Sequence, residues 1–383
     1  MHNIELCDVN TCTQCLACVN VCPKGCISMV PSKDGFQMPS IDRNECVECG
    51  MCLKSCHRIS SNVEYRNPLR TFACWTKNVA DRENSSSGGA FSVLAKQIIS
   101  SGGVVFGATM DKDLKVRHIF IEQDKDIHLL QGSKYIQSYL GDVYKQVRVE
   151  LKKDRMVLFT GTPCQIGGLL SYLRKSYENL ITCDMVCHGV PSQSAFDIYI
   201  EKIGIKSKCD NFKFRFTKGW GYQLSSLYKT KSKLIVPSKA YYLRAFSKGL
   251  MFNESCYSCS YARPERISDI TLADYWGLGK NIPFCHPKKK GVSLMLVNSK
   301  KGLDIINTCQ DLFLEERPLV EAVEGNYNLS HSSERPIGRD TYFEDSQQMS
   351  ISELCRKYGI SASLKDYLRI IKALYINLSS RAI

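Results

Sequence analysis

The sequence lacks the segments that direct a chain to a membrane or hold it there. No uninterrupted apolar run reaches the length of about 18 residues that a membrane-spanning helix needs. The residues before Cys7 contain neither the basic stretch nor the apolar run of a secretory signal. No basic motif interleaved with aromatic residues indicates nucleic-acid binding. We therefore expect a cytoplasmic protein with no transmembrane segment and no nucleic acid among its partners.

Acidic residues are the scarcer charge, with 38 Asp and Glu against 51 Lys and Arg, for a formal net charge of +13. The first 57 residues depart from this balance, because they hold six acidic and four basic side chains, a net −2 that leaves +15 on the rest. A basic body can attract an acidic partner such as a small ferredoxin, or a polyanionic cofactor. A solvated surface with surplus lysine is the plain alternative.

Cysteine, by contrast, is abundant, with 20 residues. Thiols stay reduced in a cytoplasmic chain, so metal ligation or catalysis explains them better than disulfides. Eight of them form two blocks of the pattern Cys-x2-Cys-x2-Cys-x3-Cys, offset by 34 residues: Cys12, Cys15, Cys18, Cys22, and Cys46, Cys49, Cys52, Cys56. In such a repeat three cysteines of one block and the last cysteine of the other hold each [4Fe–4S] cluster. The repeat therefore predicts two clusters, with Cys56 completing the first and Cys22 the second.

Zinc is the rival interpretation of these blocks, because it also favours Cys-x2-Cys pairs. A tetrahedral zinc site does not require a third cysteine and then a fourth at x3, so we favour iron–sulfur. His57 follows the second block where proline is usual, as Pro23 follows the first. Cys7 and Cys26 lie outside the ligand pattern, and we interpret Cys26 as a small core residue. The segment between the blocks predicts a β-hairpin.

The body of the chain alternates helical and strand-like patterns. Helices are predicted within 88–103, 141–153, 165–175, 192–203 and 299–309, strands at 104–110, 155–161, 180–186, 269–277 and 292–298, and a β-rich stretch at 211–236. This alternation favours an α+β protein, with a dicluster ferredoxin domain at 1–60 followed by a mixed α/β core domain at 70–335. A helical tail is predicted at 340–383. Within it, 364–378 has the pattern of an amphipathic basic helix that docks on its own body or on a partner or membrane surface.

Three loops of the body are candidates for ligand binding. Gly88 and Gly89 follow three serines and open a helix, where bare N–H groups suit an anion such as a pyrophosphate, although glycine pairs are also common turn material. The loop 160–165 lies between a strand and a helix, where open sheets place ligands. The polar loop 132–138 offers Lys134 to a phosphate or a reduced flavin.

Four more cysteines could form a further metal site: Cys164, Cys187, Cys256 and Cys259. Spacing alone leaves a structural zinc, an iron–sulfur cluster and unconnected buried cysteines all open.

Several ordered motifs together resemble a known family. They are the cysteine repeat, SSSGGAFSVL, GSKYIQS, LFTGTPCQIGGLLSYL, DMVCHGVPS, SCYSCSYARPERISDITLADYWG and GNYNLSHS. Over residues 1 to about 335 the chain resembles the beta subunit of coenzyme F-420 hydrogenase/dehydrogenase. The resemblance implies an FAD-binding core with its own [4Fe–4S] cluster, held by Cys164, Cys187, Cys256 and Cys259. It places the flavin near Ser87, Gly88, Gly89, Lys134, Tyr135, Gln137, Thr162 and Gln165, with Cys183 and His188 as non-ligands beside the site.

The same resemblance implies an oxidoreductase that moves electrons between reduced coenzyme F-420 or ferredoxin, FAD and the clusters. The organic substrate is unknown, and polysaccharide biosynthesis is one setting, because bacterial members of this shape often accompany such genes. FAD joins two-electron to one-electron chemistry, so no acid–base pair is nominated. The alternatives are a non-catalytic electron-relay subunit of a larger complex, and a ferredoxin head on a binding domain without flavin.

Overall fold

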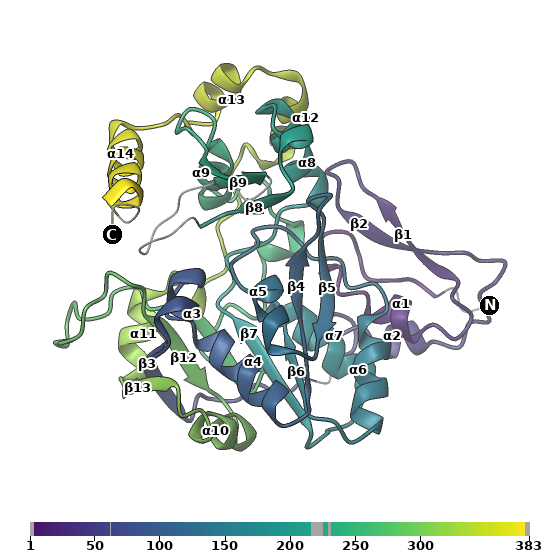
Figure 1. Ribbon diagram of the computed structural model, residues 1–383. Helices are drawn as coiled ribbons and strands as arrows, with labels where there is room; N and C mark the ends of the chain where they lie inside the picture. The colour runs from purple at the N-terminus through teal and green to yellow at the C-terminus, as the bar shows by residue number, and fades with distance from the viewer. Residues whose placement is uncertain (1–3, 62, 216–224, 229–230, 380–383) are drawn as a thin grey trace.

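A mixed sheet of eight strands forms the centre of the computed structural model, which describes residues 4–61, 63–215, 225–228 and 231–379 (Figure 1). The strand order is β13-β3-β12-β11-β7-β6-β4-β5. The strands are β3 Arg70–Thr76, β4 Val104–Met110, β5 Val116–Ile121, β6 Val157–Thr160, β7 Leu180–Met185, β11 Ile270–Asp274, β12 Ser293–Val297 and β13 Leu312–Glu316. Strands β4, β6, β7 and β11 pair in parallel, and the strands on both flanks pair antiparallel. The predicted mixed α/β body is thus confirmed as a large mixed sheet.

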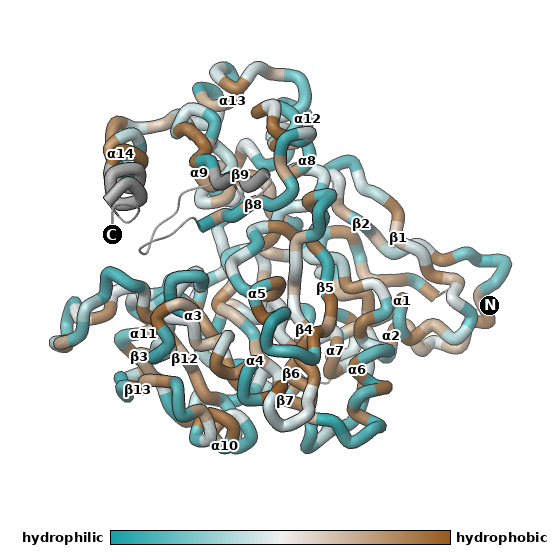
Figure 2. Tube along the Cα trace, viewed as in Figure 1, coloured by the Kyte–Doolittle hydropathy of each residue, from teal (hydrophilic) through white to brown (hydrophobic). Residues whose placement is uncertain are grey.

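Helices follow the strands, and those at residues 90–100, 143–152, 163–173, 193–202 and 300–307 lie where the periodicity predicts them. The helices are α3 Val79–Asn84, α4 Ala90–Ser100, α5 Ile127–Leu130, α6 Val143–Lys152, α7 Pro163–Leu173, α8 Gln193–Lys202, α10 Lys300–Asn307 and α11 Leu319–Gly325, with short 3₁₀ turns at Asp124–Asp126, Lys206–Lys208, Glu254–Cys256 and Tyr327–Leu329. Every residue of β12 is buried, and so are Val104, Val105 and Phe106 of β4. Figure 2 shows brown stretches along the inner strands and teal on outer loops. Burial on both faces explains why these inner strands have continuous apolar runs.

The N-terminal repeat forms a small separate lobe, the ferredoxin head (residues 4–57), at the right of Figure 1. Its hairpin consists of β1 Ile27–Pro31 and β2 Gln37–Ile41, which pair antiparallel as predicted. Two short helices, α1 Ala17–Val21 and α2 Met51–Lys54, each begin inside a cysteine block.

A second layer above the sheet combines helices and a small sheet. It contains α8, α9 Tyr241–Ser247, α12 Arg339–Gln348 and α13 Ile351–Lys357, with a three-stranded antiparallel sheet of β8 Asn211–Lys213, β9 Ser225–Tyr228 and β10 Lys231–Leu234. Residues 216–224 and 229–230 of the predicted β-rich stretch lie outside the described residues. Tyr342 and Leu354 are buried in one apolar cluster with Phe196 and Tyr242. The first part of the predicted tail thus packs against α8 and α9, and the domain limits stay a prediction.

The final helix, α14 Leu364–Ser379, occupies the predicted position at the upper left of Figure 1. Leu364, Leu368 and Ile371 are 76 %, 58 % and 62 % exposed, whereas Asp366 and Arg369 line a cleft of the body. The start of α14 therefore borders this cleft and leaves apolar side chains exposed, and its docking role stays a prediction. Within the described residues, no helix has both the length and the apolar character to cross a bilayer.

Candidate functional site

Two cavities in the ferredoxin head are lined by cysteines, and each draws on both sequence blocks. The first cavity is lined by Cys12, Cys15 and Cys18 of the first block together with Cys56 of the second. The second cavity is lined by Cys46, Cys49 and Cys52 together with Cys22. The blocks are thus paired in the way that the repeat predicts for two clusters, and the ligand assignment itself stays a prediction.

The thiols around the first cavity sit where a free thiolate is unfavourable. Burial raises the pKa of Cys18 to about 12, and the neighbouring Cys56 contributes in the same direction. Burial likewise raises the pKa of Cys15, with Cys18, Cys56 and Cys164 adding to the effect. Crowded buried thiolates need a bound cation to become stable. The donor set therefore fits an iron–sulfur cluster, whose irons supply that positive charge.

The cysteines surround these cavities without converging on a point. Within 4–61, 63–215, 225–228 and 231–379, no three Cys, His, Asp or Glu side chains gather closely enough to hold a single metal ion.

Helix α7 connects the ferredoxin head to the sheet. It begins after the predicted loop with a capping box, in which the side chains of Thr162 and Gln165 each accept a hydrogen bond from the backbone N–H of the other residue. Cys164 lies in its first turn, and Gly168 lies one turn later on the same face. A Cβ atom at Gly168 would be 2.7 Å from Cys15 Cβ and 2.9 Å from Cys15 Sγ. The glycine therefore lets the first cavity approach the helix that carries Cys164.

The four predicted core cysteines gather on the head-facing side of the body. Cys164 comes from α7, Cys187 follows β7, and Cys256 and Cys259 lie in and just after a 3₁₀ turn. Burial raises the pKa of Cys256, and the nearby Cys187, Cys164 and Cys259 raise it further. The structure thus brings the four thiols within electrostatic reach of one another, a donor set that fits a third cluster. Cys183 lies on β7 and His188 next to Cys187, and both line the adjacent cleft.

Hydrogen bonds hold the loop of the first cavity against this group. His57 bonds Thr13 Oγ1 through Nε2 at 3.0 Å and Tyr261 Oη through Nδ1 at 2.7 Å. Asn253 donates to the Cys12 carbonyl at 2.9 Å. Burial lowers the pKa of His57 to about 3, so it bonds as a neutral imidazole. The residue that replaces the usual proline thus joins the head to the segment that follows Cys259.

A cleft of about 990 Å³ opens beside these cysteines, at the carboxyl ends of β6, β7 and β11. Cys187 forms part of its wall, so the core cysteines border it directly. The volume is at the upper end of the range for ligand pockets, and the edge is where open parallel sheets bind ligands. Residues of the loop 160–165 therefore line this cleft, and ligand binding there stays a prediction.

Seven of the eight predicted flavin residues line this cleft: Ser87, Gly89, Lys134, Tyr135, Gln137, Thr162 and Gln165. Gly88 lies behind the wall, where its N–H donates to Ser293 Oγ at 2.9 Å and a Cβ would meet the Cys74 carbonyl at 2.4 Å. Gly89 caps α4 with φ of +85°, a conformation that suits glycine. The Gly pair thus opens α4 as predicted, and only one member reaches the cleft.

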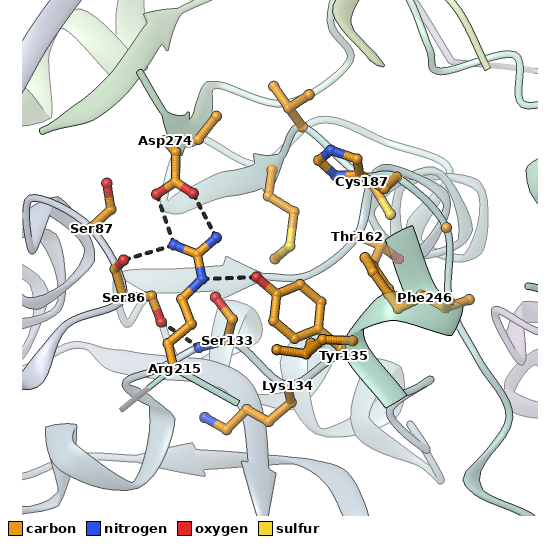
Figure 3. A pocket seen from close by; sticks show the side chains of 18 of the residues that line it. Ser86, Ser87, Ser133, Lys134, Tyr135, Thr162, Cys187, Arg215, Phe246 and Asp274 are labelled. Carbon is orange, nitrogen blue, oxygen red and sulfur yellow. Dashed lines mark hydrogen bonds and ion pairs between the residues drawn. The ribbon is translucent and has the colours of Figure 1, made fainter. Parts of the chain in front are cut away.

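The polar side chains of this set differ in how far they are already engaged. Lys134 Nζ donates to the carbonyls of Leu129, Leu130 and Gln131, and burial lowers its pKa to about 7. It extends away from the middle of the group shown in Figure 3. Gln137 is the contrast, because its Oε1 is buried without a hydrogen-bond partner. A buried acceptor of this kind fits a donor group on a bound molecule, as FAD would provide.

Sequence reasoning missed the ion pair at the centre of the cleft. Arg215 bonds both carboxylate oxygens of Asp274, at 3.0 and 2.6 Å, and both side chains are 7 % exposed. It also donates to Tyr135 Oη at 2.8 Å and to the Ser86 carbonyl at 2.8 Å (Figure 3). Asp274 is the last residue of β11 and lies inside one of the motifs. That position was the sequence signal that could have indicated a role for it. No sequence pattern around Arg215 indicated its role, because its partner Asp274 lies 59 residues away along the chain.

A second missed network lies under the loop 132–138. His118 Nε2 is 2.9 Å from the Thr160 carbonyl, and its Nδ1 is 2.9 Å from Ser138 Oγ. Gln165 donates to Ser138 as well. Burial lowers the pKa of His118 to about 4. These bonds fix the floor of the cleft between β5 and α7.

Two family models match the chain. The model for the C terminus of the beta subunit of coenzyme F420 hydrogenase/dehydrogenase matches residues 154–322, and the model for a 4Fe-4S dicluster domain matches residues 11–58. The first range contains the four core cysteines and the part of the cleft wall that includes Thr162, Arg215 and Asp274, and the second contains the eight cysteines of the repeat.

Similar proteins were found among curated sequences and solved structures. The F subunit of F(420)H(2) dehydrogenase from Methanosarcina mazei is 23 % identical over 237 residues, which cover 57 % of this chain and 66 % of that protein. Nitrogen fixation protein FixG of Rhizobium meliloti is 28 % identical over 111 residues, covering 29 % of this chain and 18 % of FixG. The chain thus spans just under two thirds of the first relative. A chain of the F420-reducing [NiFe] hydrogenase complex from Methanosarcina barkeri aligns with a TM-score of 0.49 and 14 % identity over 76 % of this chain and 92 % of that chain.

Proposed function

Residues 154–322 belong to the family of coenzyme F420 hydrogenase/dehydrogenase beta subunits and residues 11–58 to the 4Fe-4S dicluster domains, and from this premise we propose that the chain is an iron–sulfur flavoprotein oxidoreductase. Its two head cavities and the core cysteines would hold three [4Fe–4S] clusters, and the cleft would hold FAD. Reduced coenzyme F-420 or a ferredoxin is the proposed electron donor, and an organic substrate, with polysaccharide biosynthesis as one setting, is the proposed acceptor.

The observation that carries the proposal is the series of cysteine sites from the surface to the cleft. Cys49 in the second cavity is exposed, and the first cavity lies in the same lobe. Cys15 of the first cavity contacts α7 beside Cys164. Cys187 of the core group forms part of the cleft wall. A series of redox centres in this order carries single electrons between the protein surface and a molecule in the cleft.

FAD bound in the cleft would supply the exchange between two-electron and one-electron chemistry. The chain itself would orient the ligand and hold its charges. Tyr135 and Phe246 offer aromatic surface, with ring centroids 4.7 Å apart. The buried Gln137 Oε1 offers a hydrogen-bond acceptor. Lys134 offers a positive charge at pH values below its pKa of about 7. No general acid or base is assigned.

The test is anaerobic purification of the full chain with iron, acid-labile sulfide and flavin measured in the same sample. About twelve irons and one FAD per chain are expected, four irons for each cluster. About eight irons would remove the core cluster, and stoichiometric zinc with little iron would overturn the proposal. The absence of flavin at full iron content would leave only the ferredoxin head on a binding domain.

A non-catalytic electron-relay subunit is the second candidate, favoured because the relative from Methanosarcina mazei is named as a subunit. Turnover separates the two functions. An isolated chain that oxidises reduced F-420 or ferredoxin with a dye acceptor is an enzyme by itself, whereas a relay protein turns over only when the other members of its complex are present.

A further inference from the structure

Two cysteines outside the predicted ligand sets lie in the head cavities. Cys7 lines the first cavity beside the four cysteines already named, and Cys26 lines the second in the same way. Each cavity therefore has five cysteines, one more than a cubane needs. None of the other described cysteines outside the ligand sets lines either cavity: Cys74, Cys183, Cys209, Cys285, Cys309 and Cys355.

Each extra thiol lies in a cavity with ligands from both blocks. Cys26 Sγ is 3.4 Å from Cys22 Sγ, and Cys46 lines the same cavity. Cys7 lines the first cavity together with Cys12 and Cys56, and its Sγ lies 3.1 Å from Thr11 Oγ1. The two cavities thus repeat one arrangement, although Cys7 and Cys26 do not correspond in the 34-residue repeat.

The position of Cys26 is fixed by the backbone around it. It directly precedes β1, and its carbonyl accepts from the Asp42 N–H at 2.8 Å, next to β2. A buried cysteine that only fills space bonds differently. Cys309, for example, is buried against α10 and donates its S–H to the Ile305 carbonyl. Burial in a small core therefore does not by itself account for a thiol that contacts a ligand sulfur.

We propose that Cys7 and Cys26 are auxiliary thiols of the two head clusters, and this rests on the proposed function. Each donates its S–H to a ligand sulfur, and each can replace the adjacent last cysteine of a block, Cys56 or Cys22, as the fourth ligand. In the replacement the auxiliary sulfur would bond to iron as the bond from the last cysteine of the block breaks, and its proton would pass to the leaving sulfur, or to solvent where alanine stands in place of that cysteine. No electron is gained or lost, so the exchange needs no oxidant or reductant.

The experiment compares Cys22→Ala, Cys26→Ala and the double variant, each purified anaerobically as the full chain. Iron and sulfide are counted, and the reduced clusters are recorded by electron paramagnetic resonance. Cys22→Ala is expected to keep close to parental iron because Cys26 takes its place, with an altered spectrum from the changed ligand. The double variant is expected to lose about four irons, a third of the total.

Cys49→Ala is the matched control, because Cys49 lines the same cavity whereas the sulfur contact of Cys26 goes to Cys22. It is expected to lose about four irons although Cys26 is present. Equal iron loss in Cys22→Ala and the double variant would overturn replacement by Cys26. Full parental iron in the double variant would overturn the assignment of Cys22 as a ligand, whereas a parent chain with little iron would overturn the proposed function, so the failures are distinguishable.

Cys26→Ala alone tests the hydrogen bond. It is expected to keep all iron and to lower the reduction potential of one head cluster, because hydrogen bonds to the sulfurs tune that potential. Cys309→Ala, a buried cysteine away from the cavities, is expected to leave both potentials unchanged. An unchanged potential in Cys26→Ala would contradict the bond, and loss of iron would make Cys26 a primary ligand. Cys56→Ala with Cys7→Ala repeats the test at the first cavity.

Discussion

The ferredoxin head and the eight-stranded body are stabilised in different ways. The buried apolar cluster beside the second cavity has four members, and two of them, Cys26 and Cys52, are cysteines. The body instead buries complete strands, such as β12, and continuous runs within β4 and β6. A lobe of this size hardly buries enough apolar surface to fold by itself. The head therefore takes its stability from its ligand sites and its contact with α7, and the body from its apolar core.

Iron removal should have the largest effect, and it should separate the two regions. Chelation under anaerobic conditions is expected to abolish amide protection in β1 and β2, because crowded buried thiols lose the cation that holds them. Protection in β7 and β12 should persist. Hydrogen exchange measured by mass spectrometry, before and after chelation, checks both regions at once. Equal loss in both would mean that the body depends on iron as much as the head.

Breaking the buried ion pair of the cleft should destabilise the body alone. Asp274→Asn leaves the Arg215 charge without its carboxylate, at a cost of about 3–5 kcal/mol in the free energy of unfolding. Because Arg215 also holds Tyr135 and the Ser86 carbonyl, bound flavin should fall in the same variant. The double variant Arg215→Met, Asp274→Leu should unfold later in urea than Asp274→Asn. Head iron should be unchanged in both, and a loss of head iron would contradict the separation of the two regions.

The contact between the regions can be tested at Gly168. Alanine favours a helix over glycine by about 1 kcal/mol, so Gly168→Ala should stabilise α7 if nothing else changed. Its Cβ would instead meet Cys15 Cβ at 2.7 Å and Tyr144 Oη at 2.7 Å. A net loss of about 1–3 kcal/mol is expected from overpacking, together with slower reduction of the core cluster by the head. Urea unfolding and freeze-quench electron paramagnetic resonance measure the two effects. A more stable Gly168→Ala protein would show that head and helix do not touch.

The smallest effect is a pH dependence of the body. Burial holds the pKa of His118 at about 4, below its unfolded value of about 6.5. The unfolded chain therefore binds a proton below pH 6.5 that the folded chain does not, and stability falls as pH drops. Between pH 6.5 and 5.5 this residue should cost about 1 kcal/mol. In His118→Gln the urea midpoint should vary less over this interval, whereas His128→Gln, at an exposed histidine, should follow the parent.

The two regions also differ in how much of them the sequence predicts. The head can be predicted from short stretches of sequence. The spacing within each block determines which thiols share a loop, and the hairpin between the blocks has its own turn signals. The cleft is assembled from distant segments. Strands β3, β5 and β13 were not predicted, because pairing within the sheet stabilises them, in β3 and β13 with residues far away in the chain.

Within the cleft the same rule holds residue by residue. The loop after β6 could be located because parallel sheets place ligands at strand ends, and Cys164 and Thr162 are there. Arg215 could not, since its role depends on Asp274, Tyr135 and Ser86 being brought together by the sheet. The extra thiols Cys7 and Cys26 were left outside the pattern for the same reason. Spacing along the chain does not give their distance to a cysteine of the other block.

The exposure of Cys49 determines where oxygen damages the molecule first. Cys49 is the exposed member of the second cavity, whereas the first cavity has its loop pressed against α7 and the core cysteines are partly buried. Oxidative loss should therefore proceed inward, from the outer head site toward the cleft. Aerobic handling would then give a mixture of species that have lost the outer head site but keep the sites nearer the cleft. Such species could no longer exchange electrons at the surface, and they would look like an intact but inactive protein.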